Sequence, residues 1–192
     1  MPKNTKKMTI KEYEKNYGKA YVEVTSYNKV KIISKETKTA EKLTIEDLKK
    51  PLNNIGITDY KLKILEERGV KFTRKNVLEV FTKTESNMIF WLEKGSKSRG
   101  GMEHILYKHG LELRKLGIKE EEITNVIGNL LKSKPMYRLI DSRGPNMIYR
   151  FGEKYLLLAY GTNGFIVSFY SLRTENDLRR MLSKAIQIIK LD

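Results

Sequence analysis

The chain has 192 residues, of which 38 are Lys or Arg and 23 are Asp or Glu, so its formal net charge is +15 at pH 7. This length is enough for one domain, or for a compact domain with a smaller unit beside it. The absence of cysteine excludes disulfides and thiolate metal ligands. The chain also has only two histidines, which cannot form a three-histidine zinc site, and we expect neither a metal nor a cofactor.

The excess of positive charge favours a polyanionic partner, with nucleic acid first and an anionic membrane surface second. A lysine-rich composition can also come from an AT-rich genome, in which case the lysines are only solvated surface. No apolar run approaches the roughly 20 residues that span a bilayer, and the basic start of the chain lacks the apolar core of a signal peptide. We therefore expect a cytoplasmic protein without a membrane partner.

Residues 1–73 are predicted to form a small mixed α+β unit of unknown role. After a basic, polar start, two segments alternate between apolar and polar residues around the turn SYN, which is typical of a hairpin. Two Thr residues then occupy positions typical of helix N-caps, and a glycine follows the second helix. The expected elements are strands over 19–25 and 29–35 and helices that start at Thr44 and Thr58, the second ending at Gly69.

Residues 74–192 are predicted to form a second, larger domain. Two strands around the turn KTES lead to the glycine- and serine-rich break GSKSRGG, and two helices follow it. The first helix carries both histidines and is expected to be interrupted at Gly110. The second presents one apolar face. The expected strands are 76–82 and 87–93, and the apolar face consists of Ile123, Val126, Ile127, Leu130 and Leu131.

Residues 136–172 are predicted to form an antiparallel meander, because their strand-like segments are separated only by the short connections SRGP, GE and GTNG. A closing helix over 174–190 begins at a Thr174–Asp177 capping pattern. The predicted class is therefore α+β. The expected strands are 136–141, 146–152, 154–161 and 164–172.

His104 and His109 are five positions apart in GGMEHILYKHG. Five residues of an ideal helix rotate by about 500°, so the two side chains should point about 140° apart. His109 lies in line with the apolar Met102, Ile105 and Leu106. One reading makes His109 a half-buried core residue and His104 a surface residue. The other lets Gly110 bend the chain and release His109 into a cleft.

The last predicted strand adds a hydroxyl and a phenol, because a period of two places Ser168 and Tyr170 on one face. Arg138, Arg150 and Lys154 lie on neighbouring strands and could converge on the same region. A solvent-facing strand with polar residues outward would show the same pattern. Together with an imidazole, however, these groups match the needs of metal-free RNA cleavage, which requires a proton acceptor, a proton donor and positive charge around the phosphate.

The segment WLEKGSKSRGGMEHILYKHG, with the two helices, the meander and GFIVSFYSL after it, resembles nucleases of the barnase, EndoU, colicin and RelE-like (BECR) superfamily. The resemblance covers about residues 74–173. It implies two helices packed on a four-stranded antiparallel sheet and a metal-independent ribonuclease of phage or toxin type. It also implies a catalytic histidine, His104 or His109, with Ser168 and Tyr170 on the last strand. Arg150 and Lys154 are the cations expected to complete the site.

The leading hypothesis is an endoribonuclease that cleaves RNA by 2′-hydroxyl attack and leaves a 2′,3′-cyclic phosphate. The sequence does not identify which RNA is cut, and tRNA, rRNA and mRNA are all candidates. An acidic immunity protein or antitoxin would then suit its basic cleft as an inhibitor. The alternative is a basic nucleic-acid- or partner-binding phage protein on a degenerate nuclease scaffold. A third reading is a phage structural or injected protein.

Overall fold

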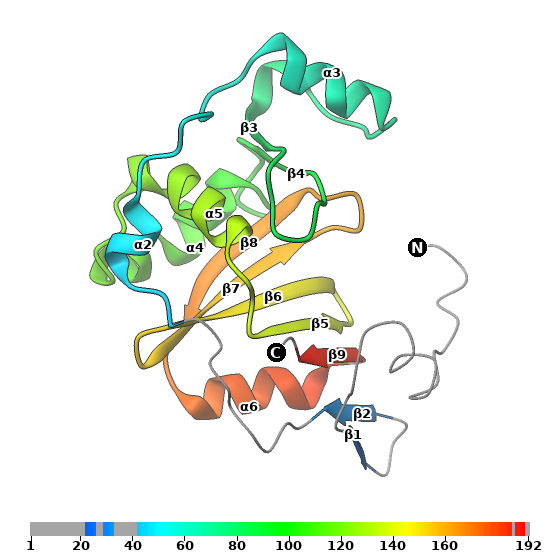
Figure 1. The fold of residues 1–192 in the computed structure, drawn as a ribbon, viewed down its shortest axis with the longest axis vertical. Coiled ribbons are helices and arrows are strands. Elements are labelled where there is room, and N and C mark those ends of the chain that lie inside the picture. Colours follow the sequence, from blue (N-terminus) through cyan, green and yellow to red (C-terminus); the bar gives the residue numbers. More distant parts are fainter. Residues whose placement is uncertain (1–21, 26–28, 33–41, 186, 191–192) are drawn as a thin grey trace.

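The computed structural model describes residues 22–25, 29–32, 42–185 and 187–190 and shows an α+β protein in which helices cover both faces of an antiparallel sheet (Figure 1). The basic start of the chain and the outer ends of the predicted 19–25 and 29–35 strands lie outside these residues. In chain order the elements are β1 (Val22–Thr25), β2 (Lys29–Ile32), α2 (Ile45–Lys49), α3 (Asp59–Glu67), the 3₁₀ turn η1 (Arg74–Asn76), β3 (Val77–Phe81), β4 (Phe90–Glu93), α4 (Met102–Lys115), the 3₁₀ turn η2 (Glu120–Glu122), α5 (Ile123–Lys132), β5 (Tyr137–Asp141), β6 (Gly144–Phe151), β7 (Lys154–Tyr160), β8 (Ile166–Leu172), α6 (Glu175–Lys184) and β9 (Gln187–Lys190).

The main sheet has the strand order β8-β7-β6-β5-β9, and every neighbouring pair is antiparallel. The predicted four-strand meander is confirmed as β5 to β8. The predicted helix over 174–190 is wrong in its second half, because α6 ends at Lys184 and residues 187–190 pair with β5 as β9. The physical reason is that Ile188 and Ile189 are β-branched and favour a strand where the edge of β5 is open to pairing.

Two apolar layers hold the sheet between helices. On one face α4 and α5 pack on the sheet, and on the other α6 does. All five predicted apolar positions of α5 are buried. The core between the sheet and α4 and α5 includes Ile105, Leu113, Met147, Tyr149, Leu156, Leu158 and Phe169.

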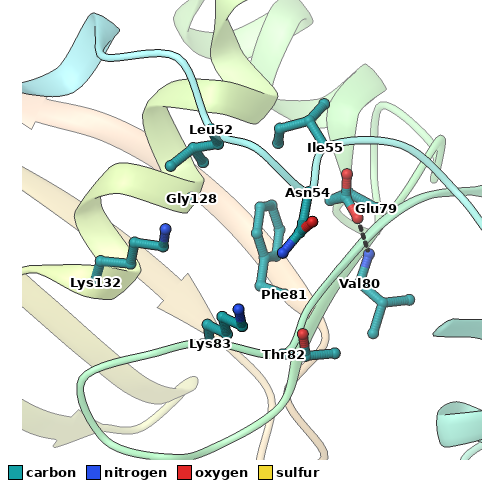
Figure 2. Close-up of a pocket in the computed structure, with 10 residues that line it drawn as sticks. All are labelled: Leu52, Asn54, Ile55, Glu79, Val80, Phe81, Thr82, Lys83, Gly128 and Lys132. Atoms are coloured by element: carbon teal, nitrogen blue, oxygen red, sulfur yellow. Dashed lines mark hydrogen bonds between the residues drawn. The ribbon is translucent and has the colours of Figure 1, made fainter.

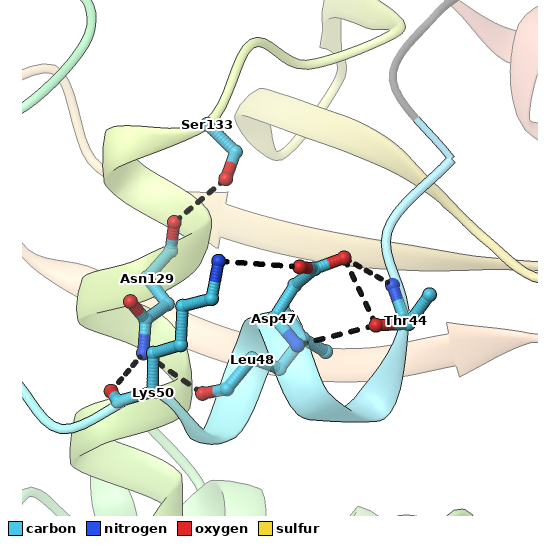
Figure 3. A network of polar contacts seen from close by, with 6 residues as sticks. All are labelled: Thr44, Asp47, Leu48, Lys50, Asn129 and Ser133. Atoms are coloured by element: carbon cyan, nitrogen blue, oxygen red, sulfur yellow. Dashed lines mark hydrogen bonds and ion pairs between the residues drawn. The ribbon is translucent and has the colours of Figure 1, made fainter.

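Residues 43–52 pack into the same core as the larger predicted domain. Leu43 and Leu48 are buried there, and the Leu43 backbone exchanges hydrogen bonds with the chain at Arg150 and Gly152. The predicted cap at Thr44 is confirmed as a capping box with Asp47 (Figure 3). Asn129 of α5 donates to the carbonyl oxygens of Leu48 and Lys50 at 2.9 and 2.8 Å. The core therefore contains residues from both sides of position 73.

A smaller cluster joins α3 to the β3–β4 hairpin, where Trp91 packs against Phe165 at the start of β8. The Thr58 cap of α3 and the Gly69 turn after it are confirmed, with Gly69 in the left-handed region at φ +66°. The strand predicted over 87–93 is shorter than expected. It begins at Phe90, because Asn87 is itself left-handed at φ 58° and extends the turn.

A buried ion pair joins Lys61 of α3 to Glu79 of β3. The Lys61 ammonium also donates to the carbonyl oxygens of Asn54 and Gly56. The Glu79 carboxylate accepts from the backbone N–H groups of Gly56 and Val80. The pair therefore ties the 54–56 loop to β3.

In the part of the chain that the structure describes, no helix has the length and apolar character needed to cross a membrane.

Candidate functional site

Helix α4 begins directly against the edge strand β8. The Gly101 N–H donates to the Val167 carbonyl oxygen at 3.0 Å. Gly101 has φ +89°, and a Cβ there would lie 2.7 Å from the Glu93 carbonyl oxygen, so only glycine fits. The predicted break GSKSRGG is thus a tight connection that docks the helix on the strand.

The expected interruption at Gly110 is wrong, because α4 runs without a break from Met102 to Lys115. A glycine inside a helix costs about 1 kcal/mol relative to alanine. The packing of Ile105 and Leu113 in the core stabilises the helix on both sides of it. His109 therefore stays on the helix and is not released into a cleft by a bend.

The two imidazoles are nevertheless neighbours. The ring centroids of His104 and His109 are 6.2 Å apart, with an edge-to-face angle of 67°. The expectation that the two side chains point apart is wrong, since it rested only on the directions of the Cα–Cβ bonds. Helical side chains lean toward the N-terminus of their helix, so the His109 ring can reach back toward His104. One phosphodiester could therefore contact both rings.

His109 also stacks on Tyr170 of β8. The ring centroids are 4.6 Å apart and the ring planes differ by 19°. Burial lowers the pKa of His109, and His104 and Lys108 lower it further, while Glu112 opposes the shift. The His109 imidazole is therefore mainly neutral at pH 7, which is the state that a general base requires.

A carboxylate and a guanidinium extend this arrangement beyond His109. The Nδ1 atom of His109 is 3.8 Å from Oε2 of Glu112, and Nε of Arg173 donates to Oε1 of the same carboxylate at 3.2 Å. A carboxylate beside Nδ1 favours the tautomer that carries its hydrogen there. The lone pair of neutral His109 is then on Nε2, the other ring nitrogen.

The backbone orients His104 in a similar way. Its Nδ1 atom is 2.8 Å from the Lys97 carbonyl oxygen in the GSKSRGG segment. Because a carbonyl oxygen can only accept, we assign the hydrogen to Nδ1. The second ring nitrogen, Nε2, is then the atom that can exchange a proton with a ligand.

Ser168 and Tyr170 lie two residues apart on β8, opposite Ala159 and Leu157 of β7, so they share a face of the strand as predicted. The Ser168 hydroxyl is buried and has no hydrogen-bond partner among the residues that the structure describes. Burial raises the pKa of Tyr170, Arg143 lowers it, and Asp141 and Glu112 raise it further. The phenol is therefore protonated at neutral pH and can donate a hydrogen bond.

The predicted cations occupy other places. Arg150 pairs with Tyr155 in the β6–β7 ladder, and Lys154 is exposed at the turn, opposite Phe151. Tyr170 lies opposite Leu157, two residues further along β7 than Tyr155. The guanidinium of Arg138 binds Glu85 at 2.7 Å. The register therefore does not group Arg150 or Lys154 with the rings of His109 and Tyr170.

The cations around Tyr170 and Glu112 are Arg143 and Arg173, neither of which was predicted from the sequence. Arg143 belongs to the SRGP turn, which the pattern identified only as a connection. Arg173 follows β8 directly, three residues after Tyr170. The short distance in sequence from Tyr170 could have pointed to Arg173. Its contact with Glu112, however, depends on how α4 crosses β8.

A pocket lies elsewhere, between the β3–β4 hairpin, α5 and the segment 52–55, with Phe81 in the middle of its lining (Figure 2). Lys83 and Lys132 reach it from the hairpin and from α5. Gly128 leaves room for Leu52, since a Cβ there would lie 2.4 Å from Leu52 Cδ1. No predicted catalytic residue lines this pocket.

Among the residues that the structure describes, no group of three or more His, Cys, Asp or Glu side chains could hold a metal ion. No protein-family model matches the chain, and no curated protein matches it.

Proposed function

We propose that the protein is an endoribonuclease that works without a metal ion, with His104 and His109 as its acid and base. The observation that carries the proposal is the 6.2 Å separation of the two imidazole centroids beside the Tyr170 phenol. Two imidazoles at one place can accept and donate a proton in the same reaction at neutral pH. The sequence has no other histidine.

In the proposed reaction, His109 Nε2 accepts the proton of a ribose 2′-hydroxyl, and the 2′-oxygen attacks the adjacent phosphorus. The bond from phosphorus to the 5′-oxygen breaks as His104 donates a proton to that oxygen. The products are a 2′,3′-cyclic phosphate and a 5′-hydroxyl. The assignment of His109 as the base follows from its lowered pKa, which burial causes.

Negative charge on the phosphate oxygens increases as the 2′-oxygen attacks. The protonated Tyr170 phenol is a donor beside His109, and Arg143 and Arg173 supply positive charge nearby. Donors and cations that are fixed in advance stabilise such a transition state. Glu112 lies next to His109 and holds Arg173 by an ion pair.

The arrangement of the elements supports the proposal that residues 74–173 have a BECR-like fold. Helices α4 and α5 precede the β5–β8 meander and pack on one face of it, which is the order and packing that the resemblance implies. We propose a toxin or phage enzyme that acts in the cytoplasm, with an acidic immunity protein or antitoxin as inhibitor. The net charge of +15 suits both RNA and such an inhibitor.

The test is cleavage of total cellular RNA in EDTA by the wild type, H104A and H109A. Each substitution should lower the rate about 10² to 10⁴-fold, the usual contribution of one acid or base. Lys115→Ala, at the exposed end of α4, is the control that keeps full activity. A cyclic phosphate at the new 3′ ends, and resistance of 2′-O-methyl RNA, would identify the mechanism.

Full activity in both histidine variants would overturn the assignment. The alternative of a binding protein on a nuclease scaffold predicts no cleavage by the wild type. It also predicts salt-sensitive RNA or DNA binding that is indifferent to both histidine substitutions.

A further inference from the structure

We infer that the exposed side of α4 around Tyr107 is a stacking platform for an unpaired nucleobase of the RNA. Tyr107 is 62% exposed, although tyrosine is usually packed over much of its surface. The inference rests on the proposed function, because it assigns a substrate subsite to the same helix that carries His104 and His109.

Two cations accompany this ring. The ammonium of Lys97 is 5.1 Å from the Tyr107 ring centroid, and that of Lys108 is 5.4 Å from it. Aromatic rings with adjacent cations are how proteins hold single-stranded nucleic acid, since the base stacks and the backbone is neutralised. When a base takes the ring face, the two ammonium groups can turn to the neighbouring phosphates.

The platform is next to the proposed reaction centre. Tyr107 is three residues after His104 on one continuous helix, so the two side chains are surface neighbours. Lys97 also links them, because its carbonyl oxygen accepts from His104 while its ammonium lies over Tyr107. A base on Tyr107 would therefore belong to a nucleotide close to the scissile phosphate.

A second apolar side chain extends the platform. Leu111 is one helical turn beyond Tyr107 and is 75% exposed. Two large apolar side chains thus face outward at helical spacing, with lysines beside the aromatic one. This combination fits an unpaired nucleotide, whose base is apolar on its face and whose backbone is anionic.

The test measures binding of the full chain to a fluorescein-labelled, single-stranded 2′-O-methyl oligonucleotide, which the proposed reaction cannot cleave. Tyr107→Ala should weaken binding about tenfold, the usual scale for loss of one base–aromatic stack. Tyr107→Phe should bind like the wild type, because the ring remains. Tyr60→Ala is the matched control, since Tyr60 is a 72% exposed tyrosine on α3, and it should leave the affinity unchanged.

An oligonucleotide with abasic sites separates stacking from charge. With it, the penalty of Tyr107→Ala should disappear, whereas K97Q and K108Q should still each reduce the salt dependence by about one phosphate contact. The inference is overturned if Tyr107→Ala binds like the wild type, or if its penalty is the same with the abasic oligonucleotide. The second outcome, with an unchanged melting temperature, would mean that Tyr107 contacts the backbone of the oligonucleotide and not a base. Because this readout needs no cleavage, it is independent of the fate of the nuclease proposal.

Discussion

The imidazole of His109 lies flat against the phenol ring of Tyr170, with centroids 4.6 Å apart. One ring belongs to a helix and the other to the edge strand of the sheet, so the stack joins two elements as well as two side chains. It contributes to the burial that lowers the pKa of His109. Changes at Tyr170 should therefore act on the titration of a residue 61 positions away in sequence.

Replacement of Tyr170 by alanine should raise the pKa of His109 toward its ordinary value of about 6.5. The physical reason is that removal of the phenol ring lets water reach the imidazole and stabilise its charged form. An NMR titration of the histidine ring protons measures this directly. Tyr170→Phe keeps the stacked ring and should leave the pKa close to that of the wild type. Equal pKa values in all three proteins would contradict a role for the stack in burying His109.

Replacement of Glu112 by glutamine should move the pKa of His109 in the opposite direction, further down. The Glu112 carboxylate favours the protonated imidazole, and the neutral amide does not. Glu103→Gln is the control, because Glu103 is on the same helix but pairs with Lys94. In the RNA assay, Glu112→Gln should also lower the rate, since Arg173 loses its carboxylate partner. If E112Q and E103Q gave the same histidine titration, Glu112 would have no electrostatic influence on His109.

The stability of the fold should depend on pH through His109. Its pKa is lower in the folded than in the unfolded chain, so the unfolded chain binds the proton first as the pH falls. The contribution of His109 is full above its ordinary pKa of about 6.5 and is lost as the pH falls from there through its folded pKa. Chemical denaturation of the wild type and His109→Gln at about pH 7.5 and pH 5 tests this. The wild type should lose more free energy of unfolding on acidification, and parallel losses would argue against the pKa shift.

Lys61→Met should destabilise the fold strongly, by about 3–5 kcal/mol, because it leaves a buried charge on Glu79 without a partner. Only 1% of the Glu79 side chain is exposed. Adding Glu79→Gln to Lys61→Met should recover part of the loss, since the amide removes the charge and its oxygen can still accept from Gly56 or Val80. Urea denaturation of both variants measures the difference. A double variant less stable than Lys61→Met would mean that an unpaired charge on Glu79 is not what destabilises the single variant.

Much of the fold could be predicted from the sequence, because its signals are local. The capping threonines at positions 44, 58 and 174 mark helix starts, and short turns between apolar runs define the β5–β8 meander. The errors came from tertiary contacts. Residues 187–190 form a strand because β5 offers a partner, and Gly110 stays helical because residues on both sides of it pack into the core. Neither effect is visible in a short window of sequence.

The site was predictable in its residue types and less so in its geometry. The pattern singled out His104, His109 and Tyr170, and the structure brings all three together. The helical wheel placed the imidazoles apart, because it omits the lean of side chains along a helix. Arg143 and Arg173 lie in or next to connections, where the pattern gives no signal, whereas Arg150 and Lys154 lie on the predicted strands. Which cations surround Tyr170 depends on how α4 crosses the edge of the sheet.

Leu43 and Leu48 pack in the core that α5 and the sheet form, so the chain cannot be shortened to the larger predicted domain without loss of core residues. A fragment of residues 74–192 would keep both histidines and Tyr170, yet it would lose two side chains that are at most 2% exposed. It would also lose the carbonyl groups that accept from Asn129. The newly uncovered surface of α5 would be apolar, which favours aggregation over folding. The shortest fragment that keeps the whole core therefore begins before Leu43.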